Sequence, residues 1–147
     1  MDADKVIAIL NGLIETCRDG ENGFKTAADG LQDPKIKSLF QQYSRQRAEM
    51  ARELQDEVRR LGGNPEQRGS VAGAMHRGWI DIKSIVTGRD DNAIVAEAER
   101  GEDSAKRMYE DALQAALYTQ TLALVREQSM KVHDAHDRVR ALEKVTH

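Results

Sequence analysis

The chain has 147 residues, of which 32% are charged and 4% aromatic, and 22 basic against 25 acidic side chains give a formal net charge of -3. A chain of this length fits one domain that buries roughly two-thirds of its unfolded surface without disulfides, and its lone cysteine and unbasic N-terminus favour a bacterial-type cytoplasmic location. The sequence has no basic stripe with stacking aromatics and no apolar run of about 20 residues, which argues against nucleic acid as the main partner and excludes membrane insertion.

Two segments in the first half of the chain have the apolar period of amphipathic helices. We predict helices over residues 4–30 and 34–61, whose inward faces carry Val6, Leu10, Leu13, Cys17, Phe24, Ala28 and Leu31 in the first and Ile36, Phe40, Tyr43, Met50, Leu54, Val58 and Leu61 in the second. Gly30 is a natural C-terminal cap, and Asp33 before Pro34 predicts the next N-cap. Because the link is only three residues long, the two helices are expected to be antiparallel neighbours.

The second half of the chain begins with a shorter apolar segment. We predict a crossover helix over residues 70–87 that carries Val71, Met75, Trp79, Ile82 and Val86. Two long helices follow, over residues 92–118 and 121–144, with an unmarked turn near 118–121. The crossover can travel the length of the molecule, so the third long helix is expected to run parallel to the second. The predicted fold is all-α, a single domain over 1–147 that forms a four-helix bundle with a long helical crossover between helices 2 and 3.

Three polar residues fall on faces that periodicity assigns to the core. Glu21 and Glu102 interrupt the stripes of the first and third long helices, and His136 lies between Val132 and Val139 in the fourth. Counting the helical rise back from each turn places Glu21 level with the region 45–50 and Glu102 level with His136. These side chains are the candidate functional residues.

Glycine precedes each of the two glutamates, as Gly20-Glu21 and Gly101-Glu102. A glycine inside a helix costs about 1 kcal/mol relative to alanine, so this pairing predicts a close backbone approach at both places. The same pairing weakly suggests a duplicated helical hairpin.

The pattern resembles the ferritin-like superfamily, through Glu102-x-x-Ala105-x-x-x-Tyr109 and the looser Glu21-x-x-Phe24. Di-iron members of that superfamily supply one Glu from each of two helices and a Glu-x-x-His pair from each of the other two. The whole chain, including the stretches 76–79 (HRGW) and 135–138 (AHDR), resembles a bacterial family of ferritin-like four-helix-bundle proteins of unknown function. This resemblance implies a ferritin-like fold and little about chemistry.

The chain departs from the di-iron pattern in two helices. Arg47 and Met50 stand where the second helix would carry its Glu-x-x-His pair, and His133-x-x-His136 replaces the pair in the fourth. One reading is a metal-free core network of Glu21, Arg47, Glu102 and His136, since an arginine fork and an imidazole neutralise buried carboxylates. The alternative is an iron or manganese site made by Glu21, Glu102 and His136, with His133 as a weaker candidate.

These readings lead to different functions. The metal-free network favours a structural or interaction protein over an enzyme. Such a protein would have no cofactor and would associate with itself through helix faces or with a protein partner. The metal site favours a metal-binding protein linked to iron storage or oxidative-stress handling, and a small-molecule binder is a third, weaker alternative. We further interpret Cys17 as a small buried apolar residue rather than a redox thiol. Trp79 is interpreted as the anchor that packs the crossover onto the bundle, and the alternative is a partner or ligand patch formed by His76 and Trp79.

Overall fold

The computed structural model describes residues 2–66 and 79–146, and within these ranges the chain forms five helices and no strand. The helices are α1 (Ala3–Gly30), α2 (Pro34–Arg60), α3 (Ile82–Thr87), α4 (Asp91–Gln114) and α5 (Thr119–Thr146). The prediction of an all-α chain is therefore confirmed. None of the helices in these ranges is long and apolar enough to span a bilayer.

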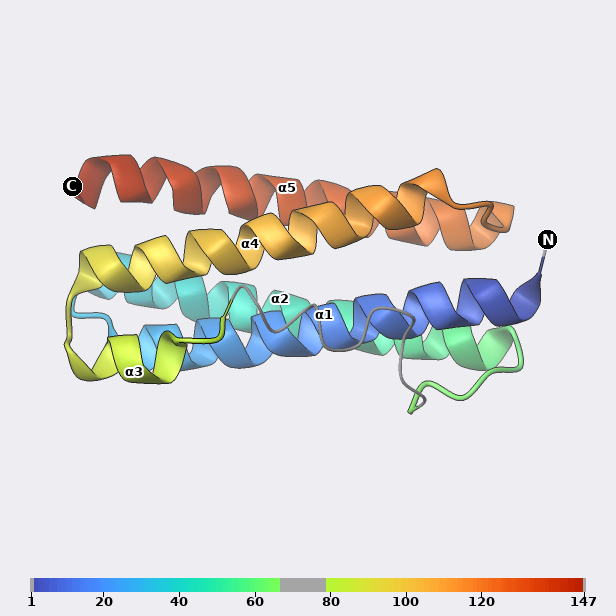
Figure 1. The fold of residues 1–147 in the computed structure, drawn as a ribbon, viewed down its shortest axis with the longest axis horizontal. Coiled ribbons are helices and arrows are strands. Elements are labelled where there is room, and N and C mark those ends of the chain that lie inside the picture. Colours follow the sequence, from blue (N-terminus) through green and yellow to red (C-terminus); the bar gives the residue numbers. More distant parts are fainter. Residues whose placement is uncertain (1, 67–78, 147) are drawn as a thin grey trace.

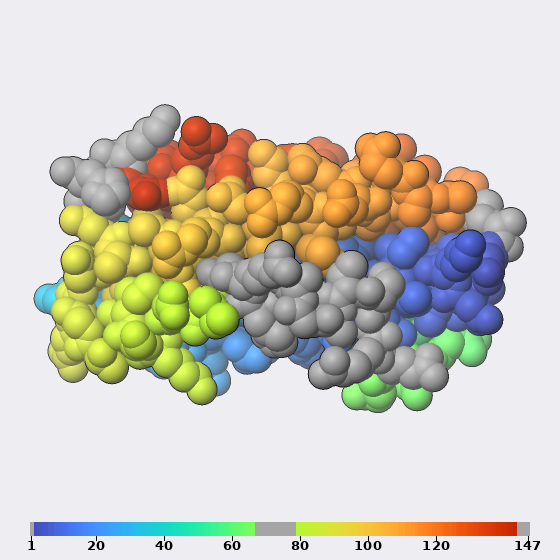
Figure 2. Space-filling view, viewed as in Figure 1, coloured from blue at the N-terminus to red at the C-terminus, as the bar shows by residue number. Residues whose placement is uncertain are grey.

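The four long helices lie side by side along the long axis of the molecule (Figure 1). α1 and α2 run in opposite directions, as do α4 and α5, whereas α2 and α4 run in the same direction (Figure 1). α2 ends at the opposite end of the molecule from α3 and from the start of α4, in keeping with the predicted crossover between helices 2 and 3. On the face shown in Figure 2, α4 lies along the molecule between α5 and α3.

Hydrogen bonds at the helix ends fix the height of α4 relative to α2. Asp33 caps α2 by accepting hydrogen bonds from the backbone N–H groups of Lys35 and Ile36, at 2.8 and 3.3 Å. The carboxylate of Asp91, in the first turn of α4, accepts hydrogen bonds from the backbone of Gln32 at 2.9 Å and of Asp33 at 3.0 Å. The start of α4 is thereby tied to the turn between α1 and α2, and this sets which residues of the two helices face each other.

Some helix boundaries differ from the sequence prediction. The apolar pattern predicts a helix over 92–118, but α4 ends at Gln114, and α5 begins at Thr119 rather than at 121. Leu117 in the link is buried in the core, so packing holds this turn without a glycine or a proline. Of the crossover helix predicted over 70–87, the described part is a turn at 79–81 followed by α3, while Val71 and Met75 lie outside the described residues.

The buried apolar side chains form two clusters, one toward each end of the molecule. One cluster includes Leu10, Leu54 and Val125, and the other includes Phe40, Ile94 and Val139. Between them, α2 and α4 each place a charged side chain inside the molecule, and these two side chains are the starting point for the site.

Candidate functional site

An ion pair joins α2 to α4 between the two apolar clusters. The guanidinium Nη2 of Arg47 donates hydrogen bonds to both carboxylate oxygens of Glu102, at 2.8 and 2.9 Å. The side chains are 1% and 0% exposed, respectively. Such charge-assisted bonds in a desolvated interior are strong, and the loss of either partner would leave an uncompensated charge there.

The room for this large cation comes from a glycine on α1. A β-carbon placed on Gly20 would lie 3.1 Å from Nη1 and 3.2 Å from Cγ of Arg47. The guanidinium carbon also lies 5.5 Å from the centre of the Phe24 ring, within the range of a cation–π contact. The predicted close approach at Gly20 is therefore that of a side chain, Arg47, rather than of a second backbone.

Burial raises the pKa of the Glu102 carboxyl, because an ionised carboxylate loses its hydration there, and the adjacent Arg47 acts in the opposite direction. Both oxygens of Glu102 are hydrogen-bonded to a permanent cation. A metal ion that coordinated Glu102 would therefore lie next to the Arg47 guanidinium, which would repel it.

Glu21 does not join this ion pair in the structure. Its carboxylate lies 2.9 Å from Nη1 of Arg18 on the same helix, and its side chain is 29% exposed. The inward position between Cys17 and Phe24 is occupied by Gly20, which satisfies helical spacing as well as Glu21 does. A glycine has no side chain that would mark it as part of an apolar face, so the periodicity alone assigned the inward position to Glu21.

His136 is buried on α5, but its ring nitrogens contact aspartates rather than Glu102. Nε2 lies 2.5 Å from Oδ1 of Asp103, and Nδ1 lies 3.2 Å from Oδ1 of Asp137. His133 is partly exposed at the α4–α5 boundary, with Nε2 3.7 Å from a carboxylate oxygen of Glu110. The structure thus separates the predicted residues into the Arg47–Glu102 pair, the outward Glu21, and two histidines that face α4.

The structure adds two residues that the sequence analysis missed, Glu99 and Asp103. Together with His136 they offer donor atoms that all lie within 4.8 Å of one another. Counting the helical rise placed His136 level with Glu102, and the adjacent Asp103 is the residue that reaches it. The spacing of four between Glu99 and Asp103 on α4 was a signal that could have identified them.

A chain of buried polar groups extends from the ion pair toward α5. Cys17 Sγ lies 3.2 Å from the hydroxyl of Tyr109, which donates a 2.7 Å hydrogen bond to Gln128 Oε1. Gln128 Nε2 donates in turn to the backbone oxygen of Met50 and to Glu53 Oε1. Burial raises the pKa of the Cys17 thiol to about 11, which keeps it protonated and unreactive near neutral pH.

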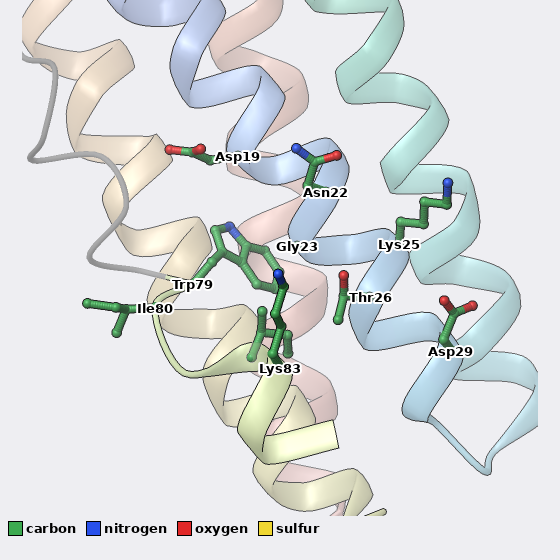
Figure 3. Close-up of a pocket in the computed structure, with 10 residues that line it drawn as sticks. Asp19, Asn22, Gly23, Lys25, Thr26, Asp29, Trp79, Ile80 and Lys83 are labelled. Atoms are coloured by element: carbon green, nitrogen blue, oxygen red, sulfur yellow. The ribbon is translucent and has the colours of Figure 1, made fainter. Parts of the chain in front are cut away.

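A cavity with a volume of about 670 Å³ lies between α1 and the segment around α3 (Figure 3). The indole of Trp79 lies beside Gly23 in this view, and a β-carbon on Gly23 or on Gly101 would fall within 2.4 Å of an indole atom. The two glycines therefore form a slot for Trp79, consistent with its interpretation as an anchor. His76 lies outside the described residues. The cavity is lined by Asp19, Asn22, Gly23, Lys25, Thr26, Asp29, Trp79, Ile80, Ile82 and Lys83.

A family model described as "Domain of unknown function (DUF2383)" matches residues 5–115, which is most of the chain. The chain belongs to this family. The search of curated proteins finds no match. The resemblance to a family of unknown function is thus shown at this level, whereas the ferritin-like relationship stays a prediction.

The residues matched by the DUF2383 model include both members of the buried ion pair, Arg47 and Glu102. They also include Glu99 and Asp103, whereas His136 lies beyond the matched residues. The DUF2383 domain therefore contains the core ion pair within its bounds, and α5 supplies the third member of the Glu99–Asp103–His136 cluster.

Proposed function

We propose that this DUF2383 protein is a ferritin-like four-helix bundle that serves as a structural or interaction protein and is not an enzyme. In this proposal an ion pair takes the place of the metal centre found in di-iron members of the superfamily. The observation that carries it is the pair of hydrogen bonds from Arg47 to both oxygens of Glu102, two side chains that are 1% and 0% exposed.

The charges at the centre support this reading over an iron or manganese site in the same place. A divalent ion bound by Glu21, Glu102 and His136 would compete with Arg18 for Glu21 and with Arg47 for Glu102. It would also bring a divalent cation next to a guanidinium that cannot lose its proton. Since Arg47 is 1% exposed, it could not turn to solvent without opening the helices around it.

The polar groups nearest the centre also support a role without catalysis. Tyr109 and Gln128 are fully buried and are hydrogen-bonded to each other and to neighbouring protein groups. Functional side chains of an enzyme site need a place where a substrate can reach them, and these two have none among the described residues. The protein would then act through its outer helix faces, with a second copy or another protein as its partner.

Elemental analysis tests the central part of this proposal. Tag-free protein is incubated with iron(II) or manganese(II), desalted and analysed as wild type, Glu102→Gln and Asp103→Asn. We expect that Glu102→Gln does not lower the metal content of the folded protein. Near-stoichiometric metal that is lost in Glu102→Gln and kept in Asp103→Asn would refute the proposal. Sedimentation velocity over a range of protein concentrations would measure self-association.

A further inference from the structure

The cluster of Glu99, Asp103 and His136 lies where α4 meets α5, outside the core ion pair. The three donor atoms lie within 4.8 Å of one another, and the closest approach is 2.5 Å, between His136 Nε2 and Asp103 Oδ1. The side chain of His136 is 4% exposed and that of Asp103 is 45% exposed. The cluster therefore has one buried ligand and a side that is open to solvent.

The two carboxylates share one face of α4, because residues four apart in a helix are neighbours on its surface. Two like charges at that spacing repel each other. Among the described residues, no lysine or arginine forms an ion pair with either Glu99 or Asp103. A cation bound between the two carboxylates would relieve this repulsion.

The position of the imidazole between carboxylates suits a bound cation. Nε2 lies 2.5 Å from Asp103 Oδ1 and Nδ1 lies 3.2 Å from Asp137 Oδ1, and either nitrogen can carry the single proton of a neutral ring. When the N–H at Nδ1 donates to Asp137, the lone pair of Nε2 faces the carboxylates of α4 and can coordinate a metal ion. A carboxylate behind the non-coordinating nitrogen is the usual support of a metal-binding histidine.

We propose that Glu99, Asp103 and His136 bind a divalent first-row transition-metal ion at the α4–α5 boundary. One imidazole and two carboxylates suit such an ion, which forms bonds of about 2.0–2.2 Å, better than Mg²⁺ or Ca²⁺, which prefer oxygen ligands alone. Three protein ligands leave a coordination position for water on the solvent side. This site shares only His136 with the set predicted from the sequence, and it leaves the Arg47–Glu102 pair intact.

The test is a titration of tag-free, chelator-treated full-length protein with Zn²⁺ by isothermal calorimetry, repeated with Mn²⁺ followed by electron paramagnetic resonance. Wild type should bind one equivalent of Zn²⁺. Glu99→Gln and Asp103→Asn should each weaken the affinity at least tenfold, because each removes a ligand charge. Asp111→Asn, an exposed change on the same helix, should leave the affinity within twofold of wild type.

A second measurement does not depend on a variant of the buried histidine. In ¹⁵N-labelled protein, Zn²⁺ should shift the Nε2 resonance of His136 and leave that of Nδ1 in its protonated range. Three results would overturn the proposal: no binding at 1 mM Zn²⁺, an affinity unchanged in Glu99→Gln and Asp103→Asn, or an equal loss of affinity in Asp111→Asn. The proposed function would survive each of these, since it concerns Glu102 and Arg47.

Discussion

Replacing Arg47 by methionine tests whether the buried ion pair holds the helices together. The substitution leaves the Glu102 carboxylate, which is 0% exposed, without the cation that is hydrogen-bonded to both of its oxygens. Removing one partner of a buried pair typically costs about 3–5 kcal/mol, because the other charge stays desolvated. In a chain of this size that loss corresponds to a fall of roughly 10 °C in the melting temperature.

The measurement is urea unfolding of metal-free protein followed by circular dichroism, for wild type, Arg47→Met and the double variant Arg47→Met/Glu102→Leu. The double variant removes both charges and fills the space with apolar groups, so it should recover most of the lost stability. Arg52→Met is the matched control, because Arg52 forms an ion pair with Glu49 in which both side chains are 59% exposed. We expect this control to unfold at the wild-type midpoint.

The reasoning would be refuted if Arg47→Met cost less than about 1 kcal/mol, which is the range of an exposed ion pair. It would equally be refuted if the double variant were as unstable as the single one. In that case the packing of the arginine stem, rather than its charge, would account for the loss.

Three further predictions concern groups outside the ion pair. Hydrogen bonds from Arg60 lower the pKa of the Glu57 carboxyl below its usual 4.5. The ionised carboxylate therefore stabilises the folded protein above pH 4.5, and this stabilisation is lost as the pH falls through the pKa of the folded state. Urea unfolding should show that the stability difference between wild type and Glu57→Gln shrinks from pH 6 to pH 3. Cys17 should resist alkylation by iodoacetamide at pH 8 in the folded protein and react fully in guanidinium chloride, because burial raises its thiol pKa to about 11. Gly101→Ala should displace the indole of Trp79, the single tryptophan, and shift its fluorescence to longer wavelength, because the new β-carbon would fall 2.3 Å from that ring.

Each of these predictions has a matched control. Glu127→Gln, on the exposed surface of α5, should show no change in its stability difference over the same pH range. Cys17→Ser/Ser38→Cys places the thiol at an exposed position, where alkylation should be fast. Gly88→Ala brings its β-carbon no closer than 3.5 Å to a neighbour, so the fluorescence of Trp79 should not change. The Glu57 prediction would be contradicted by a stability difference from Glu57→Gln that stays constant from pH 6 to pH 3. Fast alkylation of folded wild type would contradict the Cys17 prediction, and equal fluorescence spectra for Gly101→Ala and wild type would contradict the Trp79 prediction.

The four long helices could be predicted from the sequence because their apolar stripes are long. Asp33 and Pro34 mark the start of α2 in the sequence, and that helix begins at Pro34 in the structure. The turn between α4 and α5 was less well predicted, since its position depends on burying Leu117 and not on a turn residue. A helix start that is marked by capping residues can therefore be predicted from the sequence, whereas the position of a turn that depends on a tertiary contact cannot.

The candidate site was predicted unevenly for a related reason. Glu102 entered the analysis as a charged residue on an apolar stripe, and Arg47 entered it because it stands where the ferritin-like pattern carries a Glu-x-x-His pair. A glycine that makes room for a side chain is not visible in this way, so Gly20 was passed over and Glu21 was given its inward position. Similarly, counting the helical rise predicted the level of His136 but not which side chain of α4 points toward it. Successive helical residues point about 100° apart, and Asp103 rather than Glu102 reaches His136.

The placement of the buried ion pair has a consequence for assembly during synthesis. Arg47 belongs to the hairpin of α1 and α2, whereas Glu102 belongs to α4 and is translated 55 residues later. Until α4 emerges from the ribosome, the hairpin exposes an apolar face with an unneutralised cation at its middle. Two nascent hairpins that met through this face would bring two guanidinium groups together, and their repulsion would oppose premature pairing. The residue that joins α2 to α4 in the folded molecule would therefore also disfavour pairing between two isolated α1–α2 hairpins.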